Sequence, residues 1–236
     1  MLQWGGRKKE AGWNTMKYKL VIFDLDGTIL NTLDDLADST NFALMENGLP
    51  ARTVEQVRCF VGNGIRKLIE RAVPKGSSEE LIDCVHKSFT EHYRVHCADK
   101  TKPYEGIVDV IKALRKAGLK TAVVSNKADY GVQTLCGDYF PEMFDFAVGE
   151  RQNIRRKPCP DSVNEVLGKL DVGREDAVYI GDSDVDIETA KNAGILCISV
   201  TWGFRDREFL ESHGGVRFVD KPEELYKEIC GTPMER

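Results

Sequence analysis

The chain has 236 residues, of which 42% are hydrophobic and 30% are charged, which is ordinary for a globular protein of one large or two modest domains. A formal net charge of −5 argues against a nucleic-acid partner, because a phosphate-binding surface needs an excess of basic residues. No apolar run approaches the ~20 residues that span a bilayer, so we expect no membrane partner.

The N-terminal segment and the cysteines indicate the cellular compartment of the protein. Residues 1–15 carry glycine pairs and a short basic run without hydrophobic periodicity, so we predict a disordered extension there. The N-terminus lacks the apolar core of a signal peptide. The seven cysteines are scattered and none forms a CxxC pair, which favours reduced thiols in a cytoplasmic protein over a disulfide framework or a zinc site. For the oligomeric state, we expect either a monomer or a homodimer.

The first strong pattern is an apolar run that ends in two carboxylates. Residues 20–23 have the apolar, partly β-branched character of a buried strand in a parallel sheet, and Asp24 and Asp26 follow directly. Open α/β sheets place their ligands at this edge. Because burying an unpaired carboxylate is strongly unfavourable, two of them need a shared cation or a proton. The simpler alternative is a strand end followed by an Asp26-Gly27 turn.

The next seventy residues have a helical pattern without a strand. We expect helices over about 33–44, 53–60, 65–73 and 78–97, separated by glycine and proline breaks. Residues 31–100 are therefore interpreted as an all-helical insert. The chain would enter and leave it through crossings near 29–32 and 100–104, which are natural hinges.

Strands and helices alternate through the rest of the chain. The expected strands are 121–124, 146–149, 177–180 and 195–200, and the expected helices are 107–117, 129–136, 161–170, 187–192 and 222–230. Alternation with short connections is typical of a doubly wound parallel sheet. The predicted fold class is α/β, with a Rossmann-like core formed by residues 16–30 and 101–236 and a helical cap formed by residues 31–100.

Polar side chains gather at one edge of this predicted sheet. Ser125 and Asn126 end the second strand, Asp182, Asp184 and Asp186 follow the fourth, and Lys157 lies in the loop between the third and fourth. Several carboxylates at one edge repel each other unless a hard divalent cation is bound, and oxygen ligands suit Mg²⁺. One aspartate can then attack phosphorus while a second transfers protons, and lysine, hydroxyl and metal neutralise the phosphoryl oxygens.

Four motifs along the chain resemble those of the haloacid dehalogenase superfamily of phosphohydrolases. The resemblance extends from Lys17 to the C-terminus. The motifs are Asp24-Leu25-Asp26-Gly27-Thr28, Ser125, Lys157-Pro158 and Gly181-Asp182-Ser183-Asp184-Val185-Asp186. The resemblance implies that Asp24 is the nucleophile and Asp26 the general acid and base. It implies that Mg²⁺ is held by the Asp24 carboxylate, the Asp26 main-chain carbonyl and Asp182. Asp186 would have a supporting role, ordering the metal shell or Lys157.

Three further segments are similar to the phosphoglycolate phosphatase group. They are Phe60-Val61-Gly62-Asn63-Gly64, Asn126-Lys127 and Trp202-Gly203-Phe204. We therefore expect a Mg²⁺-dependent phosphatase that hydrolyses a small phosphorylated metabolite through an aspartyl-phosphate. Substrate contacts are expected from Thr28, Asn126, Gly62 and Asn63. A sugar phosphomutase of the β-phosphoglucomutase type, an inorganic pyrophosphatase on the same fold and a non-enzymatic phosphate-binding module remain open.

Overall fold

The computed structural model describes residues 17–234, so the extension predicted over residues 1–15 lies outside the described residues. Within them, six strands form one sheet in the order β5-β4-β1-β6-β7-β8, and all neighbouring strands run parallel. The strands are β1 (Leu20–Phe23), β4 (Lys120–Ala128), β5 (Phe146–Glu150), β6 (Ala177–Gly181), β7 (Leu196–Val200) and β8 (Phe218–Val219). The chain leaves the central β1 in both directions, as a doubly wound sheet requires.

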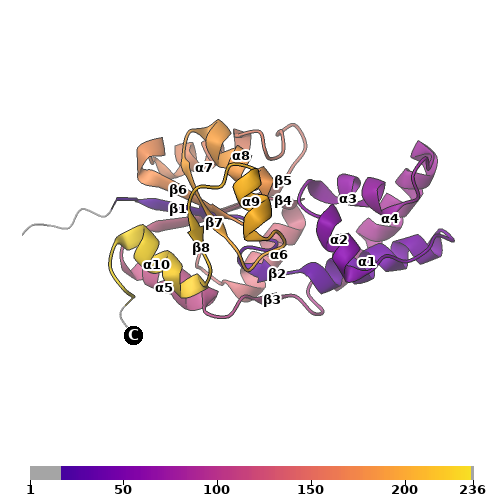
Figure 1. Ribbon diagram of the computed structural model, residues 1–236, viewed down its shortest axis with the longest axis horizontal. Helices are drawn as coiled ribbons and strands as arrows, with labels where there is room; N and C mark the ends of the chain where they lie inside the picture. The colour runs from indigo at the N-terminus through magenta and orange to yellow at the C-terminus, as the bar shows by residue number, and fades with distance from the viewer. Residues whose placement is uncertain (1–16, 235–236) are drawn as a thin grey trace, which may run out of the picture.

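Helices cover both faces of the sheet, with α7 and α8 on one side and α5 and α10 on the other (Figure 1). These and the remaining core elements are α5 (Ile107–Lys116), α6 (Asp129–Tyr139), α7 (Asp161–Leu170), the short 3₁₀ helix Arg174–Asp176, α8 (Asp184–Ala193), α9 (Arg207–Ser212) and α10 (Pro222–Cys230). The alternate residues of β1 therefore enter two different clusters. Val21 and Phe23 pack in the cluster with α5 and α10, whereas Leu20 and Ile22 pack with α7 and α8. Coverage on both faces explains the unbroken apolar run, and the predicted α/β fold class is confirmed.

Four helices lie together at one end of the molecule in Figure 1, beyond the carboxyl ends of the strands. They are α1 (Leu33–Glu46), α2 (Val54–Phe60), α3 (Gly64–Ala72) and α4 (Glu79–His96), and we call them the helical unit. Their starts follow capping rules: Thr53 and Gln56 form a capping box on α2, and the Ser78 hydroxyl accepts from the Leu81 N–H on α4. The four expected helices are all present. Their separation from the core as a cap domain stays a prediction.

The two crossings between sheet and helical unit are joined to each other. β2 (Leu30–Asn31) pairs antiparallel with β3 (Lys102–Pro103). The buried Asp35 carboxylate then accepts hydrogen bonds from the backbone N–H groups of Lys100 and Thr101, with Asp35 Oδ2 2.8 Å from Thr101 N. Strands of two residues show no periodicity, so the sequence analysis did not find this ribbon. Hinge motion at the crossings stays a prediction.

Some element boundaries differ from those expected. Ser125 and Asn126 lie inside β4, because a register shift after Val124 lets the strand continue to pair with β5 as far as Ala128. Helix α8 begins at Asp184, three residues earlier than expected, because Ser183 and Asp186 form a capping box. The short α9 and the edge strand β8 were not predicted.

Two of the bulk expectations can be compared directly with the structure. All seven cysteines lie in the described part of the chain, and none of them forms a disulfide. Among residues 17–234, no helix combines the length and apolar character needed to cross a bilayer.

Candidate active site

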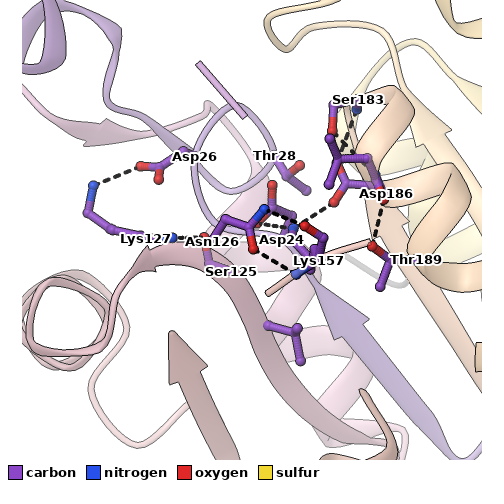
Figure 2. A network of polar contacts seen from close by, with 12 residues as sticks. Asp24, Asp26, Thr28, Ser125, Asn126, Lys127, Lys157, Ser183, Asp186 and Thr189 are labelled. Carbon is purple, nitrogen blue, oxygen red and sulfur yellow. Dashed lines mark hydrogen bonds and ion pairs between the residues drawn. The ribbon is translucent and has the colours of Figure 1, made fainter. Parts of the chain in front are cut away.

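A buried lysine joins two carboxylates at the carboxyl edge of the sheet (Figure 2). Lys157 Nζ lies 2.7 Å from Asp186 Oδ1 and 2.9 Å from Asp24 Oδ1. It also donates to Tyr179 Oη at 3.0 Å. Burial by itself would lower the pKa of Lys157, but Asp186 and Asp24 more than offset this and raise its pKa well above the usual value. Lys157 is therefore a fixed positive charge beside Asp24.

The carboxylate of Asp182 is held from two loops. Thr28 Oγ1 donates to Asp182 Oδ1 at 3.0 Å, and the backbone N–H of Phe204 donates to Asp182 Oδ2 at 2.7 Å. Asp186 is fixed in a similar way, since its Oδ2 accepts from the Ser183 hydroxyl at 2.6 Å. These donors set the direction of both carboxylates before any ligand binds.

Two glycines allow these loops to close over Asp182. Gly27 has a φ of +84°, and a Cβ added there would lie 2.3 Å from Asp182 Oδ2. A Cβ at Gly203 would lie 2.3 Å from Asp182 Cβ. Any side chain at either position would push the loops apart. The Asp26-Gly27 turn, considered above as an alternative to a functional motif, is thus part of the site's construction.

The arrangement of charges fits a divalent cation. Carboxylate oxygens of Asp24, Asp182 and Asp186 all lie within 4.8 Å of one another. Among the described residues, the buried Asp24 Oδ1 has no donor other than Lys157, with which it forms an ion pair at 2.9 Å. Chiefly because of burial, the pKa of Asp24 is raised to about 7 and that of Asp182 to about 8. Three carboxylates around one lysine leave an excess of negative charge, which suits Mg²⁺.

A second lysine–carboxylate pair lies to one side of this cluster in Figure 2. Lys127 Nζ is 3.0 Å from Asp26 Oδ1, and it also donates to the hydroxyl of Tyr93, which belongs to α4. The Lys127 side chain is only 3% exposed. The sequence analysis noted Asn126-Lys127 as a group similarity but assigned Lys127 no role. Its position directly after Ser125 and Asn126 was the available signal.

A small cavity lies between the sheet edge and the helical unit. Its volume is about 50 Å³, whereas one water needs about 10–15 Å³ on the same measure, so the cavity has room for a few waters. The sheet edge and its loops contribute the polar wall, and the helical unit contributes much of the apolar wall. Lining residues from the sequence prediction are Asp24, Asp26, Gly62, Ser125, Asn126, Lys157 and Asp182; lining residues that were not predicted are Leu36, Val61, Gly64, Ile65, Leu68, Tyr93, Lys127, Ser183, Phe204 and Arg205.

The residues expected to contact substrate have protein partners. The Asn126 amide donates to Gly62 O at 3.0 Å and to Lys157 O at 3.1 Å, and its oxygen accepts from the Lys157 N–H. It therefore links the loop of Lys157 to the helical unit. Thr28 is fully buried against Asp182, and Asn63 accepts from arginine side chains through both of its oxygens. Substrate contact by these four positions stays a prediction.

Arg205 forms a further link that the sequence analysis missed. Its guanidinium donates to the carbonyl oxygens of Arg58 at 2.8 Å and Val61 at 3.0 Å, at the end of α2. Arg156 similarly donates to Asn63 O at 3.0 Å. Both arginines lie outside the helical unit, so the α2–α3 turn is held by side chains from the rest of the protein that donate to its backbone oxygens. Only the position of Arg205 after Trp202-Gly203-Phe204 hinted at a role.

Comparison with known proteins identifies the family. The family model described as haloacid dehalogenase-like hydrolase matches residues 21–200. A phosphoglycolate phosphatase of Mesorhizobium japonicum is 33% identical over 202 residues, which are 83% of this chain and 88% of that protein. An N-acetylmuramic acid 6-phosphate phosphatase of Pseudomonas aeruginosa is 30% identical over 219 residues, 89% of this chain and 94% of that protein.

A solved structure gives the same result for the fold. The crystal structure of a provisionally assigned phosphoglycolate phosphatase from Lactobacillus delbrueckii subsp. bulgaricus superposes with a TM-score of 0.88 at 40% identity, covering 92% of this chain and 100% of that chain. The chain therefore belongs to the haloacid dehalogenase-like hydrolase family, and within it to the phosphoglycolate phosphatase-like group of phosphoric monoester hydrolases.

Proposed function

We propose that this protein is a Mg²⁺-dependent phosphatase that hydrolyses a small phosphomonoester through an aspartyl-phosphate on Asp24. The observation that carries the proposal is the meeting of Asp24, Asp182 and Asp186 with Lys157 beneath one small cavity. Mg²⁺ would be held by the Asp24 carboxylate, the Asp26 main-chain carbonyl and Asp182. When bound there, it supplies positive charge to the phosphoryl oxygens. We place the enzyme in the cytoplasm as a monomer or homodimer.

The reaction would proceed in two displacements at phosphorus. In the first, a carboxylate oxygen of Asp24 forms a bond to phosphorus while the ester bond breaks. The electron pair of that bond goes to the leaving oxygen, which takes a proton from Asp26. In the second, Asp26 takes a proton from water as the water oxygen attacks phosphorus. The bond to Asp24 then breaks, phosphate leaves, and both aspartates return to their starting forms.

The other polar residues would stabilise charge on the phosphoryl group. Lys157 lies against Asp24 and is kept protonated by its two carboxylate neighbours, so it can donate to a phosphoryl oxygen throughout the cycle. Ser125 lines the cavity and offers a hydroxyl to a second oxygen. Asp186 orients Lys157 and would have no direct contact with substrate.

The size of the cavity bears on the substrate. The relatives include a phosphoglycolate phosphatase and an N-acetylmuramic acid 6-phosphate phosphatase at similar identity, so the relatives' names do not choose between a two-carbon acid and an amino sugar. A cavity of about 50 Å³ favours the smaller ester. We therefore propose phosphoglycolate or a similarly compact phosphomonoester as substrate.

Phosphate release from a substrate panel tests this function. The panel contains phosphoglycolate, N-acetylmuramic acid 6-phosphate, pyrophosphate, p-nitrophenyl phosphate and glucose 1-phosphate with a bisphosphate primer, each with and without Mg²⁺. We expect Mg²⁺-dependent hydrolysis that is fastest with the compact ester, and a phosphoryl group on the peptide containing Asp24 after acid quenching during turnover.

Variants and competing products make the test decisive. Asp24→Asn should abolish turnover while circular dichroism stays unchanged. Glucose 6-phosphate as the main product would instead identify a mutase, and preference for pyrophosphate would identify a pyrophosphatase. A folded wild-type protein that releases phosphate from no compound would reject an enzymatic function.

A further inference from the structure

Asp26 is held by one of its two carboxylate oxygens. Lys127 Nζ lies 3.0 Å from Asp26 Oδ1, as the dashed line in Figure 2 shows. Among the described residues, no hydrogen bond or ion pair engages Asp26 Oδ2. The Asp26 side chain is 15% exposed and lines the cavity together with Asp24. The two oxygens of this carboxyl group therefore have different surroundings.

The lysine that makes this difference is fixed on several sides. Its ammonium donates to Tyr93 Oη and lies 4.6 Å from the centre of the Tyr93 ring. The aliphatic stem passes α6 at Gly131, where an added Cβ would lie only 3.3 Å from Lys127 Cε. Burial opposes the charged form, but Asp26 and Tyr93 raise the pKa of Lys127 above its usual value. Lys127 therefore remains an ammonium with little freedom to move.

The chemistry of an ammonium decides where a proton on Asp26 can sit. A lysine ammonium has three N–H donors and no acceptor, so the oxygen it contacts must accept. The carbonyl oxygen of a protonated carboxyl group accepts more strongly than its hydroxyl oxygen, so contact of the ammonium with Oδ1 favours the hydrogen of a protonated Asp26 on Oδ2. Without Lys127, either oxygen could carry the hydrogen and the side chain could rotate.

We propose that Lys127 is a positioning residue for the general acid: it holds Asp26 by Oδ1 and so keeps the transferable proton on Oδ2. Tyr93 fixes the ammonium from the helical unit, so the placement of the proton depends on a contact between the two parts of the protein. This inference rests on the proposed function, in which Asp26 protonates the leaving oxygen.

Loss of a positioning residue and loss of a purely structural residue affect different substrates. Alkyl phosphates leave as basic alkoxides and need the proton, whereas p-nitrophenyl phosphate leaves as a stable phenolate and needs little help. The ratio kcat/KM covers the steps up to the first displacement, so it reports the acid function and not the later activation of water. Misplacing the proton should therefore harm alkyl esters selectively.

The test compares Lys127→Met with wild type on two esters: p-nitrophenyl phosphate and the alkyl ester that the wild type hydrolyses fastest in the panel above. We expect kcat/KM for the alkyl ester to fall about 100-fold, within the usual range for a general acid, and that for p-nitrophenyl phosphate to fall less than about 3-fold. Tyr93→Phe keeps the ring but removes the hydroxyl, and should show the same selectivity with a smaller loss. Lys120→Met, at the opposite end of β4, is the matched control and should leave both values unchanged.

A double variant shows whether Lys127 acts through Asp26. Asp26→Asn should reproduce the selective loss, and Asp26→Asn with Lys127→Met should lose no more than Asp26→Asn alone, because effects on one function are not additive. The double variant also removes the unpaired carboxylate that Lys127→Met leaves, so it remains measurable if the single variant folds poorly.

Three outcomes would overturn the inference. An equal loss on both esters would make Lys127 a structural residue, and no loss on either would make it dispensable. Additive losses in the double variant would separate Lys127 from Asp26. A folded wild-type protein that hydrolyses neither ester would instead reject the proposed function itself, and this inference with it.

Discussion

The sheet edge and the helical unit contribute to the candidate site in opposite ways. The edge supplies buried charges: Asp24, Lys157, Asp182 and Asp186 all come from strand ends or from the loops and helix starts that follow them. The helical unit supplies apolar side chains, the Tyr93 hydroxyl and a row of backbone carbonyl oxygens. Reactive groups thus lie on one part and most of the shape of the cavity on the other. The contact of Lys127 with the Tyr93 hydroxyl is the exception, because it joins the helical unit to a charged pair of the edge.

The contacts that join the two parts differ from those inside the edge. Within the edge, charged side chains bond to one another, as in the pairs of Lys157 with Asp24 and Asp186, and backbone N–H groups also donate to carboxylates. Between the parts, Asn126, Arg156 and Arg205 bond to backbone carbonyl oxygens of the α2–α3 turn. These bonds depend on the backbone course of the turn, which favours glycine at positions 62 and 64, because both have a positive φ and a Cβ at Gly64 would lie 2.8 Å from Arg156 Nη1.

The largest expected effect comes from removing one carboxylate of the edge. Asp182→Asn should lower kcat/KM by about 1000-fold or more, because it removes an expected Mg²⁺ ligand from a site where the metal contributes several kcal/mol. Titrating Mg²⁺ against activity measures the loss and should show a raised half-saturating concentration.

A neighbouring aspartate provides the matched control for this change. Asp184 lies in the first turn of α8, is partly exposed and does not belong to the carboxylate cluster. Asp184→Asn should therefore stay within about 2-fold of wild type, as surface substitutions usually do. Equal losses in both variants, or full wild-type activity in a chelator, would contradict the metal assignment.

The second expected effect is a dependence of metal binding on pH. Burial raises the pKa of Asp24 to about 7 and that of Asp182 to about 8, so both carboxylates carry protons in mildly acidic solution. Mg²⁺ must displace these protons, and its half-saturating concentration should rise about 10-fold for each pH unit as pH falls through this range.

Low pH should weaken Mg²⁺ binding but should stabilise the folded protein when no metal is present. A carboxyl group with a raised pKa in the folded state favours folding at low pH and loses that contribution as pH rises through the raised value. The melting temperature without Mg²⁺ should therefore fall as pH rises from about 4, where an unfolded aspartate ionises, and should level off above about 8, whereas saturating Mg²⁺ should remove this fall. A half-saturating Mg²⁺ concentration that does not change with pH would contradict the prediction.

The edge was predictable from sequence because each polar group follows an apolar run. Asp24 comes directly after β1, and Asp182 comes directly after β6, so strand prediction also places the side chains. Lys127 shows the limit of this reasoning. A lysine after two polar residues is by default a solvent-exposed residue, and only the fold reveals that it is buried between Asp26 and Tyr93.

The contacts of the helical unit were less predictable for a related reason. Its helices were found from their periodicity and caps, but the side of the cavity that each would line depends on how the unit lies against the sheet. Arg205 illustrates this, because its partners are carbonyl oxygens of Arg58 and Val61, about 145 positions earlier in the chain. The β2–β3 ribbon was not predicted, because strands of two residues are too short to show an alternation of apolar and polar residues.

A smaller effect is expected where the two parts meet. Arg205→Met should raise KM about 10-fold with little change in kcat, because it removes hydrogen bonds from a charged donor that together hold the helical unit over the cavity. Steady-state kinetics measure the change, and faster amide hydrogen exchange in α2 should accompany it. Arg207→Met removes exposed ion pairs and a contact with the Phe218 ring, but Arg207 does not line the cavity, so this variant serves as the control. A fall in kcat at constant KM would instead assign Arg205 to the chemical step.

The smallest effect isolates the stability of the helical unit from the chemistry of the edge. Thr53→Ala removes the capping box at the start of α2, where the Thr53 hydroxyl accepts from the Gln56 N–H and Gln56 bonds back to the Thr53 N–H. We expect a loss of about 1 kcal/mol in the free energy of unfolding, with kcat/KM unchanged, because no charge of the edge is touched. Thr53→Ser keeps the cap and should restore most of the stability. If Thr53→Ala lowered kcat as well as the free energy of unfolding, the helical unit would contribute to catalysis directly. The charges of the edge and the shape supplied by the helical unit would then not act separately.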